Sequence, residues 1–244
     1  MKIKSLIRYF SIGERLLWSC SMLSAIVAFC IFDRENFLTL IVSLIGITAL
    51  IFCAKGNPIG QAIIIVFGGF YGYISYTSKY YGEMITYLGM TVPMAVLALI
   101  SWLKNPFEKD KPEVRINRLK LKEIVFMFFL TAVVTFGFYF ILKILGTANL
   151  LFSTISIATS FVAVYLTFRR SPFFALGYAL NDVVLIVLWV MATLKDTSYV
   201  SVVICFAVFL INDLYGFFNW LKMLRHQEKV LKEKSENIKL AYDN

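Results

Sequence analysis

The sequence predicts an all-α integral membrane protein with eight membrane-spanning helices. Of its 244 residues, 59% are hydrophobic, compared with about 45–50% in a soluble domain. Charged residues make up only 16%, and they cluster at the ends of the chain and in short segments between apolar runs. The apolar runs are about as long as the 20 residues that a helix needs to cross a bilayer.

The eight expected spans follow one another through short connections, with one longer polar segment in the middle. They are 15–32, 37–54, 58–77, 82–103, 121–144, 147–167, 172–194 and 198–221. The chain therefore divides into a first membrane repeat (1–103), a linker (104–120), a second membrane repeat (121–221) and a charged tail (222–244). The start of the tail is expected to continue the last helix.

The basic residues orient the spans. With eight spans, both termini lie on one side of the membrane. Segments on that side hold 20 of the 24 lysine and arginine residues, and the four on the opposite side are Arg34, Lys79, Lys143 and Lys195. Basic residues gather on the cytoplasmic side, so both termini and the linker are expected there. This distribution also accounts for the net charge of +9, and no nucleic-acid partner is expected.

A short internal repeat supports the division into halves. Lys55-Gly-Asn-Pro58 is matched by Arg169-Arg-Ser-Pro172, 114 residues later, and Ser101-Trp-Leu-Lys104 is matched by Asn219-Trp-Leu-Lys222, 118 residues later. Each half has four spans and begins on the same side, so the two repeats are parallel. Transporters often place their substrate site between such halves, near the bilayer midplane.

Polar residues deep in spans seven and eight mark a candidate site. Asn181 and Asp182 lie about 15 Å into span seven at about 1.5 Å per residue, and Asp213 lies in the inner half of span eight. A carboxylate at such depth is costly, and no lysine or arginine lies at comparable depth to pair with it. Asn, Thr and Tyr also hold membrane helices together, so each of these residues alone can equally be structural.

Helical spacing sorts the polar residues into faces. Asn212, Tyr215 and Asn219 form one stripe of span eight, and Tyr178 lies three residues before Asn181. We expect solute to bind between the halves, with polar groups bonded to a ribose hydroxyl and an aromatic ring stacked on a base. The expected substrate-binding residues are Gln61, Tyr87, Thr91, Phe174, Tyr178, Asn181, Asp182, Asn212, Tyr215 and Asn219.

Motifs for catalysis, metal binding and nucleotide hydrolysis are not found. The sequence has no Walker motif, GxSxG or HExxH. The four cysteines lie in apolar stretches without CxxC spacing, and the one histidine, His226, lies in the charged tail. Neither an enzyme, nor a metal site, nor a cofactor is expected.

Three segments carry a family resemblance. They are KGNPIGQ from Lys55, YYGEMITYLGM followed by ISWLKNP in span four, and NDLYGFFNWLKM from Asn212. The Tyr-x-Glu-Met opening of span four and the Gly-x-x-x-Trp ending of span eight are the most telling parts. Over most of residues 15–225, the sequence resembles the PnuC family of bacterial vitamin transporters.

The resemblance implies a fold similar to the SWEET sugar transporters, with two three-helix bundles and added helices, in the bacterial inner membrane. It implies facilitated diffusion of nicotinamide riboside or, in some branches, of thiamine, riboflavin or deoxyribonucleosides. A cytosolic kinase would trap the solute by phosphorylation, and a homotrimer is expected.

One departure from the family pattern bears on the substrate. Nicotinamide riboside carriers of the family usually show Trp-x-x-Trp before an asparagine of span seven, where this chain has Phe174 and Gly177 before Asn181. Paired indoles that would clamp a cationic pyridinium are therefore absent, although Phe174 and Tyr178 could stack a base. A neutral nucleoside stays an alternative substrate. Proton-coupled symport of another vitamin, such as thiamine or riboflavin, through Asp182 or Asp213 stays an alternative mechanism.

Overall fold

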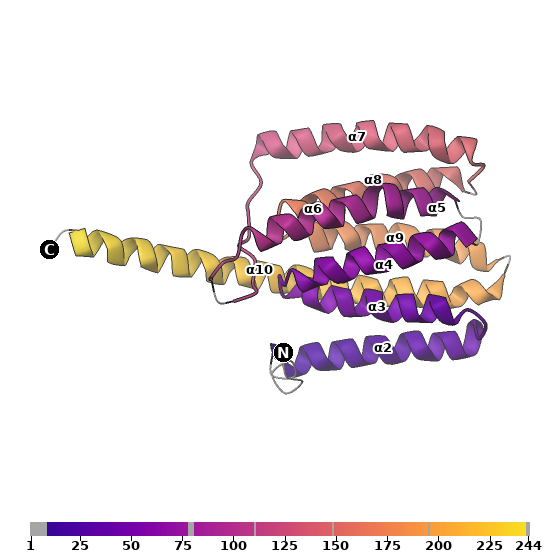
Figure 1. The fold of residues 1–244 in the computed structure, drawn as a ribbon, viewed down its shortest axis with the longest axis horizontal. Coiled ribbons are helices and arrows are strands. Elements are labelled where there is room, and N and C mark those ends of the chain that lie inside the picture. The colour runs from indigo at the N-terminus through magenta and orange to yellow at the C-terminus, as the bar shows by residue number, and fades with distance from the viewer. Residues whose placement is uncertain (1–8, 78–80, 110, 148, 195, 243–244) are drawn as a thin grey trace.

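The computed structural model describes residues 9–77, 81–109, 111–147, 149–194 and 196–242, which form a bundle of long helices (Figure 1). Within these residues, eight helices are long and apolar enough to cross a membrane, so the predicted fold class is confirmed. The elements are α2 (Ile12–Phe32), α3 (Phe37–Ala54), α4 (Ile59–Thr77), α5 (Tyr81–Thr86), η1 (Tyr87–Thr91), α6 (Val92–Leu103), α7 (Leu121–Ile144), α8 (Leu150–Phe168), α9 (Phe174–Thr193), η2 (Thr197–Tyr199) and α10 (Val200–Tyr242).

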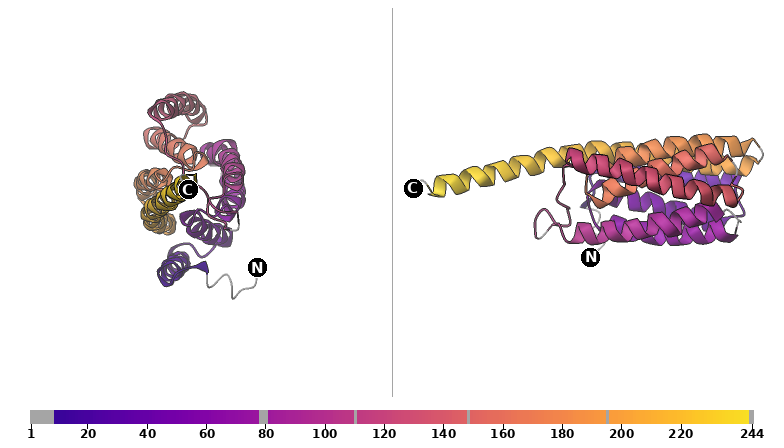
Figure 2. Two further views of the ribbon diagram at one scale, coloured as in Figure 1. Left: turned by 90° about the vertical axis from the view of Figure 1, so that its left-hand side faces the viewer. Right: turned by 90° about the horizontal axis from the view of Figure 1, so that it is seen from above.

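The helices α2 and α7 lie at the outside of the bundle, and the other spans lie between them (Figures 1 and 2). The start of α2, the chain between α6 and α7, and the projecting part of α10 lie at the same end, as an even number of spans requires. We call this the linker end. The helix α10 continues through the charged tail, which extends the predicted continuation of the last span to Tyr242.

Span four is interrupted by the π-helical turn η1. Pro93 has no N–H to donate to the carbonyl four residues earlier, and the N–H of Val92 bonds to the carbonyl of Tyr87, five residues earlier. One residue is thereby inserted into the helix. Such turns are frequent at functional sites, and this one places Tyr87 and Thr91 together on the inner side of the bundle.

The junctions α3–α4 and α8–α9 at the linker end are built alike. Gly56 has φ of 63° and Arg170 has φ of 56°. The next N–H, of Asn57 or Ser171, bonds to the carbonyl five residues earlier at 3.1 or 3.0 Å. Both helices thus end in the same left-handed cap, and the matched positions are 114 residues apart. The sequence repeat therefore has a local structural counterpart at the junctions.

Two buried tryptophans join the halves at these caps. The indole Nε1 of Trp220, on α10, donates to the carbonyl of Cys53 at the end of α3, at 2.9 Å. The Nε1 of Trp102, on α6, donates to the carbonyl of Thr167 at the end of α8, also at 2.9 Å. Each half therefore bonds to the junction of the other, and the two rings lie 5.3 Å apart between centroids.

The linker crosses both junctions and is bonded to each of them. The N–H of Val114 bonds to the carbonyl of Gly56, and the N–H of Asn117 bonds to the carbonyl of Arg170, both at 3.0 Å. Gln227, in the extension of α10, donates to the carbonyl of Val114 at 3.0 Å. Val114 and Gln227 are buried, so the polar linker is packed against the bundle and against the tail.

We expect Trp102→Phe and Trp220→Phe to destabilise the protein similarly, by about 1–3 kcal/mol each, because each loses one hydrogen bond and leaves a small cavity. Thermal unfolding of the purified protein in detergent measures this. Trp18→Phe is the matched control, because Trp18 is 36% exposed and its 3.3 Å bond goes to the hydroxyl of Thr48. An equal loss of stability for all three variants would contradict the special role of the two buried indoles.

Candidate functional site

A cavity of about 130 Å³ lies inside the bundle, between spans of both halves. Its lining combines aromatic rings with small polar groups and carboxyls, which include Gln61, Phe67, Tyr71, Glu83, Tyr87, Thr91, Ser156, Ser160, Phe174, Tyr178, Asn181, Asp182, Phe209 and Asp213. At the linker end of the cavity, the ring of Phe174 packs on that of Trp220 at 4.7 Å between centroids. Trp102 and Trp220 are fully buried behind it.

Seven of the ten expected substrate-binding residues line this cavity. The first half supplies three of them and α9 supplies four, namely Gln61, Tyr87, Thr91, Phe174, Tyr178, Asn181 and Asp182. The structure therefore brings together residues that lie more than 100 positions apart in the sequence. Whether they bind solute stays a prediction.

Asn181 is held in one orientation by α8. Its carboxamide oxygen accepts hydrogen bonds from the hydroxyls of Ser156, Thr159 and Ser160 at 3.3, 2.8 and 3.0 Å. Three donors on one oxygen leave the Nδ2 amino group as the part of the side chain that a ligand can use. Asn181 thus presents a fixed hydrogen-bond donor to the cavity.

Asp182 and Asp213 form a carboxyl pair at the cavity wall. They are 4% and 5% exposed, and both line the cavity, Asp182 from α9 and Asp213 from α10. Among the residues that the structure describes, no lysine, arginine or histidine lines the cavity. Among the described lining residues, the two carboxyls therefore have no basic partner.

Aromatic rings form two walls of the cavity. Tyr71 and Tyr87 lie 4.3 Å apart between centroids, and the hydroxyl of Tyr71 donates to Glu83 at 2.9 Å. On the α9 side, Tyr178 packs edge-on against Phe174 at 6.3 Å. A planar ring can be held between such walls, because aromatic faces and edges both pack well against it.

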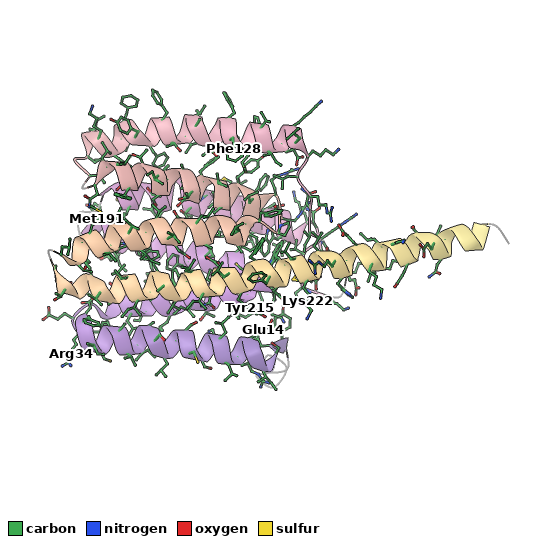
Figure 3. All side chains as sticks on the ribbon, turned by 180° about the vertical axis from the view of Figure 1, so that it is seen from behind. Glu14, Arg34, Phe128, Met191, Tyr215 and Lys222 are labelled. Carbon is green, nitrogen blue, oxygen red and sulfur yellow. The ribbon has the colours of Figure 1, made fainter. Side chains whose placement is uncertain are left out.

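Asn212 and Tyr215, two of the expected site residues, point away from the cavity and hold α2 to the bundle. Asn212 donates to the hydroxyl of Ser21 at 2.8 Å, and the Tyr215 hydroxyl donates to Glu14 at 3.0 Å. Figure 3 shows Tyr215 and Glu14 side by side near the linker end. Glu14 is also paired with Lys55 at 3.0 Å. The expectation that Asn212 and Tyr215 face Asn181 across a site is therefore corrected.

Asn219, the third expected site residue that lies outside the cavity, belongs to the α3–α4 junction. Its side chain donates to the carbonyl of Ala54 at 2.8 Å, just as the hydroxyl of Ser101 donates to the carbonyl of Phe168 at 2.9 Å. Ser101-Trp102 and Asn219-Trp220 therefore make equivalent hydrogen bonds, each to the end of a helix in the other half. Asn219 is not part of the cavity lining.

The cavity face of α10 is a neighbouring stripe. Phe206, Phe209 and Asp213 lie at i, i+3 and i+7 and line the cavity. Adjacent residues of a helix point about 100° apart at 3.6 residues per turn, so Asp213 faces inward while Asn212 faces α2. The expected stripe of Asn212, Tyr215 and Asn219 is therefore the wrong face of α10, whereas Asp213, which its depth in the sequence marked as a candidate, lies in the cavity wall.

Two further parts of the lining were missed from the sequence. Ser153, Ser156 and Ser160 lie at i, i+3 and i+7 on α8 and line the cavity, a stripe that spacing alone could have found. Tyr71 and Glu83, of spans three and four, also line the cavity and were not among the expected site residues.

Comparisons with known proteins agree with this architecture. The family described as "Nicotinamide mononucleotide transporter" matches residues 36–222. A nicotinamide riboside transporter PnuC of Neisseria mucosa is 25% identical over 214 residues, which cover 86% of this chain and 81% of that protein. The PnuC of Haemophilus influenzae is 25% identical over 193 residues, which cover 78% of this chain and 82% of that protein.

A solved structure has the same fold. The crystal structure of the vitamin B3 transporter PnuC superposes with a TM-score of 0.77 at 23% sequence identity, covering 89% of this chain and 94% of that chain. The family match extends over far more than half of the sequence, and its members are transporters and not enzymes. The chain therefore belongs to the PnuC family of multi-pass membrane transporters.

Proposed function

We propose that this chain takes up a nucleoside-like vitamin, with nicotinamide riboside as the first candidate, by facilitated diffusion across the bacterial inner membrane. A cytosolic kinase would then trap the solute as its phosphate. The cavity carries this proposal, because it combines aromatic walls, a fixed amide donor and carboxyl acceptors in one place. The names of the relatives from Neisseria mucosa and Haemophilus influenzae support the same substrate class.

The cavity suits a solute with one flat ring and one sugar. The ring would lie between the Tyr71–Tyr87 wall and Tyr178, which would take the place of the absent Trp-x-x-Trp pair. The Nδ2 group of Asn181 would donate to a carbonyl or hydroxyl of the solute, and Asp182 would accept from a ribose hydroxyl. Few polar groups at fixed positions in a mostly apolar cavity are typical of small-molecule sites.

Movement of the solute across the membrane would depend on opening of the linker end. There the rings of Phe174, Trp102 and Trp220 pack edge-on or tilted against one another between the cavity and the linker. Rocking of one half against the other, as in transporters built from repeats, would part these rings and release the solute. The sequence supports placement of this end in the cytoplasm, because 20 of the 24 basic residues belong to segments expected on that side. The family resemblance supports a homotrimer.

Proton-coupled symport, with thiamine or riboflavin as possible solutes, is the alternative. The observation in its favour is the carboxyl pair of Asp182 and Asp213, since a buried carboxyl can take up and release a proton. The two mechanisms differ in whether a proton gradient drives accumulation of the solute.

We expect Asn181→Ala to weaken binding of nicotinamide riboside by roughly three- to tenfold or more, because one hydrogen bond to the solute is lost. Isothermal titration of purified protein measures this, with thiamine, riboflavin and nucleosides as the comparison panel. Asn212→Ala is the matched control, because Asn212 bonds to Ser21 and not to the cavity. It should lower thermal stability and change the affinity by less than about twofold. An unchanged affinity in folded Asn181→Ala would assign Asn181 to helix packing alone.

We expect proteoliposomes to equilibrate the solute without ATP, because the sequence has no nucleotide-hydrolysis motif. Uptake of radiolabelled nicotinamide riboside should stop at the outside concentration, with or without a pH difference across the membrane. Accumulation above that level when the outside is acidic would show symport instead.

A further inference from the structure

A second hollow lies at the linker end. It has a volume of about 490 Å³, lies between the linker, the α3–α4 junction and α10, and shares no lining residue with the cavity between the halves. Figure 3 shows Lys222, one of its lining residues, where α10 leaves the bundle. The basic side chains that line this hollow are Lys55, Lys111, Lys222 and His226. We call it the basic groove.

Two charged groups of the basic groove already serve the fold. The ammonium of Lys55 pairs with Glu14 at 3.0 Å, which holds it at the wall of the groove. The carboxylate of Glu113 accepts a hydrogen bond from Gln227 at 2.7 Å, which joins the linker to α10. Glu113 is the one acidic residue among the described residues of the lining, against three lysines. The lining therefore carries an excess of positive charge.

Lys222 and His226 offer donors that the fold leaves unused. They lie at i and i+4 on α10, so they project from the same face of the helix, and both are exposed. Among the described residues, no carboxylate forms an ion pair with Lys222. On the linker wall, Lys111 pairs with Glu108 at 3.0 Å, but its side chain is 63% exposed, and such surface pairs are weak. Ligand donors are therefore available from both walls.

This set of donors matches a phosphate group. A phosphate monoester carries about one and a half to two negative charges near neutral pH and has three strong acceptor oxygens. Lysine binds phosphate as a point charge, and a histidine ring has an N–H donor in both of its protonation states. The volume of the groove falls within the range of about 300–1,000 Å³ that small-molecule sites have. The groove therefore has room for a phosphate and the group that carries it.

We propose that the basic groove binds a phosphate group, held by Lys111 of the linker and by Lys222 and His226 of α10. The phosphate belongs either to a soluble ester or to a lipid headgroup, which share this chemistry. The binding site itself does not depend on which solute the protein transports.

The consequence for transport rests on the proposed function. Lys55 belongs to the first half and Lys222 to the second, and both line the groove. A ligand that spans the groove therefore adds a link between the halves at the end that would have to open. Bound phosphate would hold this end closed and slow the exchange of solute.

Glycerol phosphate and glycerol are matched probes, because they differ in the phosphate and neither has a ring for the aromatic walls of the cavity. We expect isothermal titration of protein in phosphatidylcholine nanodiscs to show binding of glycerol phosphate and none of glycerol. Lys222→Gln and His226→Ala should each weaken binding by about three- to tenfold. Lys232→Gln is the control, since Lys232 is 79% exposed, lies on the same helix and does not line the groove. It should change the affinity by less than about twofold.

Two outcomes overturn the phosphate site. Equal losses in Lys232→Gln and Lys222→Gln would mean that glycerol phosphate responds to the general charge of the tail. Absence of glycerol phosphate binding in every nanodisc would leave the groove without this ligand.

Nanodiscs of phosphatidylglycerol separate the two sources of phosphate. Binding of glycerol phosphate at the same strength as in phosphatidylcholine would assign the groove to soluble esters. Binding that phosphatidylglycerol weakens in wild type, but not in Lys222→Gln, would assign it to the lipid headgroup. Both results support a phosphate site.

Uptake of nicotinamide riboside into phosphatidylcholine proteoliposomes tests the effect on transport. Glycerol phosphate on both sides should slow uptake about threefold or more in wild type. It should leave uptake unchanged in the double variant of Lys222→Gln and His226→Ala, whose uptake without glycerol phosphate should equal that of wild type. Equal slowing in both proteins would mean competition elsewhere and overturn the link between the halves. Failure of nicotinamide riboside to enter, with glycerol phosphate still bound, would overturn the proposed function and leave the phosphate site standing.

Discussion

The hydrogen bonds from Trp102 and Trp220 to the ends of α8 and α3 are the interactions on which the architecture at the linker end depends. Helices that end in apolar surroundings must find partners for their last carbonyls. Here the left-handed caps supply some of these partners, and an indole from the opposite half supplies another. Because the bonds cross between the halves, they fix the two junctions relative to each other. The linker and the cavity are both built on that arrangement.

The hydrogen bonds between the halves also give the two faces of α10 different roles. One of its faces bonds to α2 and to the α3 junction through Asn212, Tyr215 and Asn219. Its other face presents Phe209 and Asp213 to the cavity. Since the structural bonds fix the rotation of α10 about its axis, they also fix the orientation of Asp213 toward the cavity. The orientation of the cavity side chains of α10 is therefore fixed by residues that lie outside the cavity.

The sequence predicted the fold much better than the site. Span number and approximate ends follow from apolar length, which the bilayer dictates. The repeat was visible because a proline and a tryptophan recur at matching positions in the two halves. Which face of α10 lines the cavity was not predictable in the same way. Asn212 and Asp213 are both polar and both deep, and spacing gives the angle between them without saying which one faces inward. Only the packing of α2 against α10, through Ser21 and Glu14, decides that.

The length of α10 has a mechanical consequence. The helix is unbroken over 43 residues, from Val200 to Tyr242, so Asp213 and the tip of the tail belong to one rigid rod. Their separation is about 44 Å at about 1.5 Å per residue. A tilt of about 5° at the cavity would swing the tip by about 4 Å over that length. The tail can therefore act as a lever, and Gln227 attaches the linker to it about halfway between Asp213 and Tyr242, 14 residues beyond Asp213.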